Sequence, residues 1–133
     1  MADNVMQVDI VSPERILFSG SATMVVTRTL DGGEIAFQPN HAPFLAALTE
    51  SHTRIYEDGG NVLHVAVHGG FVEVSNNKVS ILSDVAELGD QIDVSRAQAA
   101  RERAEETLRR ETTDEATAAL RRAEARLAAA GRN

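Results

Sequence analysis

The sequence has no cysteine and no tryptophan, and only 4% of its 133 residues are aromatic. The absence of cysteine excludes disulfides and thiolate metal sites, which fits a reducing compartment. No run of about 18 apolar residues occurs, and the N-terminus lacks the basic start and apolar stretch of a secretory signal, so we expect neither a transmembrane helix nor a signal peptide. The acidic excess, a net charge of −7, argues against a nucleic-acid binder, because a phosphate backbone requires a basic surface.

The charged residues are unevenly distributed along the chain. Residues 1–94 contain 4 basic and 13 acidic side chains, a net charge of −9, whereas residues 95–133 contain 9 arginines and 7 acidic residues, a net charge of +2. All prolines, aromatics and histidines, and every glycine except Gly131, lie before this division, and alanine dominates after it. We therefore expect two domains, over residues 1–90 and residues 91–133.

The first domain has the two-residue periodicity of β-strands. Apolar and polar side chains alternate in several runs, so that each run offers one apolar face. These runs cover residues 6–10, 22–27, 62–68 and 79–81. Glycine, aspartate and asparagine, which tolerate tight turns, separate the runs. These turns are expected at residues 19–21, 31–33, 57–60 and 75–78. The pattern predicts an antiparallel β-sandwich or a flattened barrel.

No pattern in this domain indicates catalysis. His64 and His68 would lie about 13 Å apart on a strand, which is too far to share one metal ion. Gly69-Gly70 is not followed by the Lys-Ser/Thr of a phosphate-binding loop, and no Gly-x-Ser-x-Gly elbow occurs. Residues 38–43, in which two prolines bracket a histidine, form either a rigid connection or an exposed contact loop.

The second domain is predicted to be a helical hairpin. Residues 95–133 contain no proline and consist mostly of strong helix formers. Asp93 or Ser95 can cap the first helix, and a capping box at residues 112–115 predicts that a second helix begins near Asp114. Gly131 is suited to end that helix. The link near residues 110–113 is short enough to make the two helices antiparallel.

The expected contact between the helices consists mainly of alanines. The inward positions, spaced by three and four residues, are Ala97, Ala100, Ala104, Thr107, Ala116, Leu120, Ala123, Leu127 and Ala130. Because alanine buries little apolar surface, this contact stabilises the pair only modestly, and we hypothesise that the hairpin is a movable element. The arginines on the other faces form either a solvated, ion-paired surface or a site for an anion or an acidic partner.

Three stretches together indicate a family. They are residues 33–43 (GEIAFQPNHAP), 68–74 (HGGFVEV) and 77–84 (NKVSILSD). With them, the chain resembles from end to end the epsilon subunit of bacterial F-type ATP synthases. Ala36 and Asn40 replace glycines that are usual in this family. The resemblance implies a fold of class β + α, with an N-terminal antiparallel sandwich of about ten strands and a C-terminal antiparallel two-helix hairpin.

The resemblance also implies a function. The chain would be a non-catalytic rotor subunit of the central stalk, held at the cytoplasmic face of the cell membrane only through the complex. Its partners would be the gamma subunit, the c-ring, and the beta and alpha subunits. The turn with Asp31 and Glu34 and the loop with His41 match the ring-facing edge of the family. The hairpin of the family lies folded on the sandwich or extends along gamma into the catalytic head, where it hinders ATP hydrolysis.

Some bacterial members bind ATP as a regulatory ligand, and no other cofactor is implied. Their motif, Ile/Leu-Asp-x-x-Arg-Ala, matches residues 92–97 of this chain, and an upstream glutamate and three further arginines complete the set. The matched residues are Glu87, Ile92, Asp93, Arg96, Ala97, Arg103, Arg122 and Arg126. Two other functions stay open: a free-standing nucleotide-sensing module, suggested by the arginines alone, and a small hydrolase, which the missing catalytic patterns disfavour.

Overall fold

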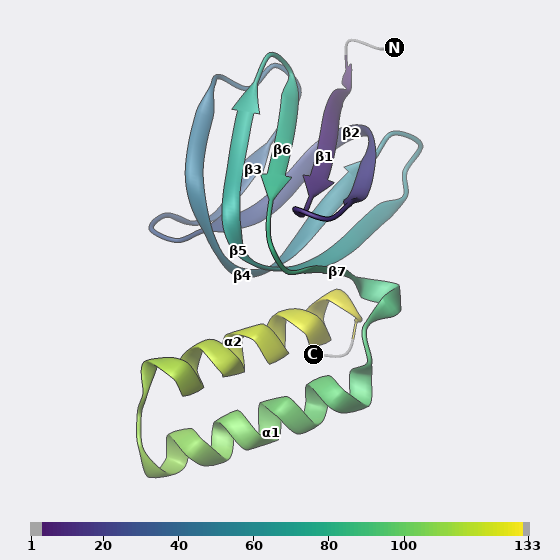
Figure 1. The fold of residues 1–133 in the computed structure, drawn as a ribbon. Coiled ribbons are helices and arrows are strands. Elements are labelled where there is room, and N and C mark those ends of the chain that lie inside the picture. Colours follow the sequence, from purple (N-terminus) through teal and green to yellow (C-terminus); the bar gives the residue numbers. More distant parts are fainter. Residues whose placement is uncertain (1–3, 132–133) are drawn as a thin grey trace.

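The computed structural model describes residues 4–131, which form seven β-strands followed by two α-helices (Figure 1). The strands are β1 (Met6–Val11), β2 (Ile16–Thr29), β3 (Gly33–Phe37), β4 (Phe44–Glu57), β5 (Val62–Ser75), β6 (Lys78–Leu82) and β7 (Ala86–Leu88). A 3-10 turn, η2 (Gly89–Gln91), leads into the helices α1 (Val94–Arg110) and α2 (Asp114–Ala129). Neither α1 nor α2 is long and apolar enough to span a membrane, and no other helix occurs in residues 4–131 that could.

The strands form one sheet that closes on itself. Its order is β1-β6-β5-β4-β2, and the barrel closes because β1 pairs with β6 in parallel and with β2 in antiparallel orientation. Strand β3 extends the sheet beyond β2 as an edge strand, and β7 pairs with β5. The two helices pack against each other at one end of this barrel, with α2 next to the sheet and α1 on the far side of α2 (Figure 1).

The expected sandwich of about ten strands is replaced, over residues 4–131, by this barrel-like sheet of seven. Strands β2, β4 and β5 have 14 residues each, and each continues as one strand through the closed sheet. In a sandwich of two separate sheets, each would be divided into two shorter strands. The turn predicted at residues 19–21 is therefore wrong. Gly20 pairs with Val8 inside the ladder, and the ring of Phe18 lies over it. The other three predicted turns are confirmed.

Aliphatic side chains fill the barrel, as the two-residue periodicity predicted. The residues that are fully buried there are Val8, Ile10, Ala22, Val25, Phe37, Ile55, Val65, Val67, Val72, Val79 and Ile81. Three hydroxyls share the interior and satisfy one another, as buried polar groups require. Thr53 Oγ1 lies 2.8 Å from Thr27 Oγ1 and 3.0 Å from Ser51 Oγ.

The helical hairpin has the predicted caps and loop. The side chain of Asp93, rather than Ser95, caps α1 by accepting a hydrogen bond from the backbone N–H of Arg96 (3.1 Å). Thr113 caps α2 by accepting from the N–H of Ala116 (3.0 Å). Only residues 111–113 separate the helices, which run antiparallel (Figure 1).

Helix α2 holds the hairpin against the barrel by packing on β4 and β5, while α1 packs mainly on α2. The apolar contact is small: Leu127 and Ala129 of α2 meet Ala66 of β5, together with Ile92 and Ala97. Ala129 lies outside the predicted seam and is buried because α2 has a second apolar face, toward the sheet. The hairpin is thus docked through few apolar side chains.

Candidate functional site

A groove of about 630 Å³ runs along the hairpin between α1 and α2. Alanines form its floor, and three of the predicted site residues line it: Arg103 of α1, and Arg122 and Arg126 of α2. Arg122 and Arg126 are one helical turn apart, which places their side chains on the same flank of α2. Three guanidinium groups in one groove are suited to bind phosphate or carboxylate oxygens in bidentate fashion.

Glu87 links this groove to the barrel. Its Oε1 atom accepts hydrogen bonds from Arg126 Nε (2.6 Å) and from His68 Nε2 (3.0 Å), so one carboxylate oxygen joins α2, β5 and β7. Burial alone would raise the pKa of Glu87, but the hydrogen bonds from Arg126 and His68 outweigh it and hold the pKa below its usual value. Glu87 is therefore ionised at neutral pH. We call Glu87, His68 and Arg126 the polar latch.

The ring of His68 is the most buried part of the latch, with 3% of its side chain exposed. Burial lowers its pKa, and the hydrogen bond to Glu87 offsets this only in part. The ring is therefore neutral at pH 7 and donates its Nε2–H to Glu87. Its Nδ1 atom is buried and has no hydrogen-bond partner within residues 4–131. The sequence analysis considered His68 only as a metal ligand together with His64 and did not predict its contact with Glu87.

The four motif residues at the start of α1 have structural roles here and do not line the groove. Ile92 and Ala97 are buried in the small apolar contact below α2. Asp93 is the α1 cap, and Arg96 supplies the backbone N–H that it binds, with an exposed side chain. Of the eight predicted residues, the structure therefore brings together four: Glu87 and the three groove arginines.

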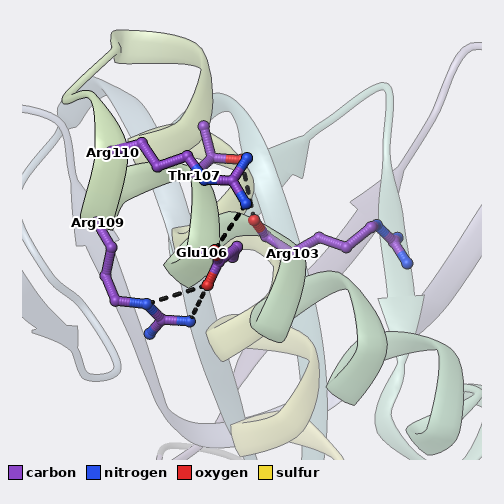
Figure 2. Close-up of polar contacts among 5 residues, drawn as sticks. All are labelled: Arg103, Glu106, Thr107, Arg109 and Arg110. Carbon is purple, nitrogen blue, oxygen red and sulfur yellow. Dashed lines mark hydrogen bonds and ion pairs between the residues drawn. The ribbon is translucent and has the colours of Figure 1, made fainter.

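The arginines of α1 differ in how they are engaged. Figure 2 shows Glu106 bound by Arg109 and by Arg110, while the side chain of Arg103 extends away from this group. Arg109 lowers the pKa of the exposed Glu106 carboxyl by its hydrogen bond and its charge. Arg103 and Arg122 form no ion pair with any described residue. Two of the three groove guanidiniums can therefore bind an anion without first leaving a carboxylate.

The residues predicted to face the c-ring flank edge strand β3. Asp31 and Glu34 are exposed near its start, and Glu34 pairs with Arg54 (3.2 Å). His41 follows its other end, half-buried, with its ring 5.0 Å from that of Phe37. A five-residue strand spans about 16 Å, so the three residues lie at the two ends of one edge and do not form one cluster.

A second histidine contact was missed from the sequence. His52 Nε2 lies 2.7 Å from His64 Nδ1, and the two rings stack with centroids 5.0 Å apart. The sequence offered one related signal, the alternation His64–Ala66–His68 on β5. The small side chain of Ala66 between two larger ones leaves room on this face of the sheet, and α2 docks there. No group of three or more potential metal ligands occurs in the part of the chain that the structure describes.

Two family models together match nearly the whole chain. The model described as "ATP synthase, Delta/Epsilon chain, beta-sandwich domain" matches residues 5–89, and "ATP synthase, Delta/Epsilon chain, long alpha-helix domain" matches residues 90–131. The chain belongs to this ATP synthase delta/epsilon family. Its relatives named ATP synthase epsilon chain include one from Brevibacillus brevis, 50% identical over 103 residues, which are 77% of each chain. Another, from Streptomyces coelicolor, is 42% identical over 128 residues, 96% of this chain and 97% of the relative.

Solved structures agree on the fold of this epsilon-type chain. A chain in the structure of the Euglena gracilis mitochondrial ATP synthase superposes with a TM-score of 0.81 at 20% identity, covering 96% of this chain and 81% of that one. A chain in the central stalk and c-ring structure from Tetrahymena thermophila gives a TM-score of 0.53 at 19% identity, covering 71% and 70%. The barrel followed by a docked helical hairpin is thus an arrangement that ATP synthase subunits adopt.

Proposed function

We propose that this chain is the rotor subunit that couples the c-ring and the gamma subunit to the catalytic head of a proton-translocating ATP synthase. It acts there without catalysing a reaction itself, and it is held peripherally at the cytoplasmic face of the cell membrane by its partners. Family membership supports this role. The regulatory part of the proposal rests on the structure of the hairpin.

An exposed apolar surface on the barrel supports the proposal that a partner subunit binds there. Leu45, Phe71 and Leu82 are 69%, 53% and 46% exposed, and they lie on the neighbouring strands β4, β5 and β6. Phe71 pairs with Leu82, and Leu45 lies diagonally across from Phe71, because Leu45 pairs with Glu73. Adjacent exposed apolar residues of this size mark contact surfaces. We assign this face to gamma and the β3 edge, with Asp31, Glu34 and His41, to the c-ring.

The single observation that carries the regulatory role is the small docking contact of the hairpin. Leu127 is its only fully buried large side chain from α2, and a buried leucine contributes about 1.5–3 kcal/mol. The main barrel core contains no helix residue. The hairpin can therefore leave while the barrel stays folded. Released, the 17 residues of α1 and 16 of α2 would reach about 50 Å end to end, enough to enter the catalytic head and hinder ATP hydrolysis.

ATP is the regulatory ligand that fits the groove. Its volume of about 630 Å³ lies within the range of about 300–1,000 Å³ for small-molecule sites. Arg103 and Arg122 are suited to the phosphates, and Arg126 would exchange the Glu87 carboxylate for a phosphate oxygen. Because both helices line the groove, bound ATP would hold α1 against α2 and so oppose the extended form of the hairpin that inhibits hydrolysis.

The inhibitory role is tested by the ATPase activity of the assembled head. Full-length chain is compared with a chain that ends near Val94, which keeps the complete barrel core. We expect faster hydrolysis with the shortened chain. Equal rates would show that the hairpin of this chain does not inhibit.

ATP binding is tested by calorimetric titration of the isolated chain. Arg103→Ala and Arg126→Ala are expected to weaken binding about tenfold or more, because each removes a charge-assisted contact to phosphate. Arg109→Ala is the matched control, because Arg109 is paired with Glu106 outside the groove. Identical heats for the wild type and both groove variants, or no heat at all, would remove ATP from the proposal.

A further inference from the structure

A second polar pocket, of about 810 Å³, lies on the opposite flank of α2. The barrel and both helices contribute to it: Arg28 comes from β2, Arg101 from α1 and Arg121 from α2. It shares no lining residue with the groove between the helices. Arg121 and Arg122 show why: consecutive residues point about 100° apart around a helix, so each serves a different flank.

The charges in this pocket are not neutralised by contacts within the chain. Its three guanidiniums share the lining with the carboxylates of Glu50 and Glu124. None of the three arginines forms an ion pair with either carboxylate or with another residue in the range 4–131. The lining thus has an excess of one positive charge.

The guanidiniums are the donors that this lining offers to a ligand. Of the neighbouring hydroxyls, that of Thr49 donates to Glu50 Oε1 (2.9 Å) and that of Ser51 lies in the buried hydroxyl cluster of the barrel, whereas Arg101 is only partly exposed. Guanidinium forks suit the tetrahedral oxygens of phosphate, each fork offering two parallel N–H donors. An elongated anion with two phosphate groups can reach arginines on different elements, which a single carboxylate cannot.

We propose that this pocket is a second anion site, which binds pyrophosphate-type ligands and clamps the docked hairpin to the barrel. The binding part is independent of the function proposed above, whereas the clamp rests on the proposal that the hairpin undocks. Arg28 belongs to the barrel, and Arg101 and Arg121 belong to the hairpin, so the complete site exists only in the docked state. A ligand that binds only the docked state stabilises that state by RT ln(1 + [L]/Kd), where [L] is the free ligand concentration and Kd its dissociation constant.

The test is calorimetric titration of the full chain with inorganic pyrophosphate. Arg101→Gln and Arg121→Gln are expected to weaken one binding site about tenfold or more, since each removes a charge-assisted contact. Arg103→Gln, in the other groove, leaves that site unchanged. Arg28→Gln tests the same site from the barrel, should a helix variant fail to fold. Absence of binding by the wild type, or a loss that follows Arg103→Gln instead, would overturn the site.

The clamp is tested separately by hydrogen exchange of the α2 amides. Pyrophosphate is expected to slow their exchange in the wild type and in Arg103→Gln, but not in Arg121→Gln. Binding without any slowing would overturn the clamp and leave the ATP titration of the first groove unaffected, so the two proposals can fail independently.

Discussion

Replacing Gly89 by alanine should undock the hairpin without disturbing the barrel. Gly89 is buried in η2, between β5 and the end of α2. A Cβ atom there would lie 2.2 Å from the carbonyl oxygen of Ala129 and 3.2 Å from that of His64. Carbon and oxygen normally approach to about 3.3 Å, so α2 must move by about 1 Å. The φ of Gly89 lies outside the left-handed region, so alanine is allowed by the local backbone.

The magnitude follows from how little holds the hairpin. Leu127 contributes about 1.5–3 kcal/mol, and the single methyl of Ala129 adds about 0.8 kcal/mol. Overpacking a filled contact costs about 1–3 kcal/mol. The cost is therefore comparable with the main apolar contribution to docking, and it should shift the ratio of docked to undocked molecules about 5- to 150-fold.

Hydrogen exchange measured along the chain checks this prediction. In Gly89→Ala the amides of α2 should exchange faster than in the wild type, while β1, β5 and β6 keep their protection. Gly20→Ala is the matched control, because its Cβ would meet only the end of the Phe18 ring, at 3.0 Å, far from the hairpin. Unchanged protection of α2, or an equal loss of protection in the strands, would refute the conclusion that Gly89 sets the docking distance.

Two further predictions concern His52 and Asp93. Burial first, and then the neighbouring His64 and Arg54, lower the pKa of His52 from 6.5 to about 4. The neutral ring therefore contributes its full stability above pH 6.5, and this contribution is lost as the pH falls toward 4. After allowance for solvent screening at this half-buried site, wild type should lose about 1 kcal/mol more than His52→Gln between pH 7 and pH 5 in urea unfolding, and parallel losses would contradict the assignment. Asp93→Ala should cost about 1 kcal/mol by removing the α1 cap, and Asp93→Asn should restore most of it. If Asp93 acts only on a ligand, both variants would unfold like the wild type.

The local features of the hairpin were predictable because their causes are local. A cap needs one side chain that reaches a backbone N–H three residues ahead, and Asp93 and Thr113 do this within their own segment. The turns at asparagine and glycine follow from the same kind of preference, and Asn76 and Asn77 do adopt positive φ. None of these depends on what packs against the segment.

A flattened barrel was one of the two predicted architectures, but the continuity of β2 and the polar latch depend on distant residues and do not follow from the local pattern. The residues 19–21 look like a turn, yet pairing with β1 and cover from Phe18 keep them inside a strand. The latch joins Glu87 to Arg126, 39 residues away, and to His68, which pattern reasoning left without a role. The family motif supplied Glu87 and Arg126 as site residues, but only the fold shows that they bind each other.

The latch and the apolar contact together give the docked hairpin one defined position, with few enough contacts for the reversible docking that we propose. An apolar contact made of Leu127, Ile92 and a few alanines gives little energy and little geometric selection. The Glu87–Arg126 bond fixes the register of α2 on the barrel, since a charged pair at 2.6 Å tolerates little sliding. The same bond ties up one of the three groove guanidiniums, so the ATP that we propose for this groove would compete with Glu87 for Arg126. On that proposal, ligand binding and docking would be coupled through the single side chain of Arg126, while Arg103 and Arg122, which form no ion pair with a described residue, would contact the ligand first.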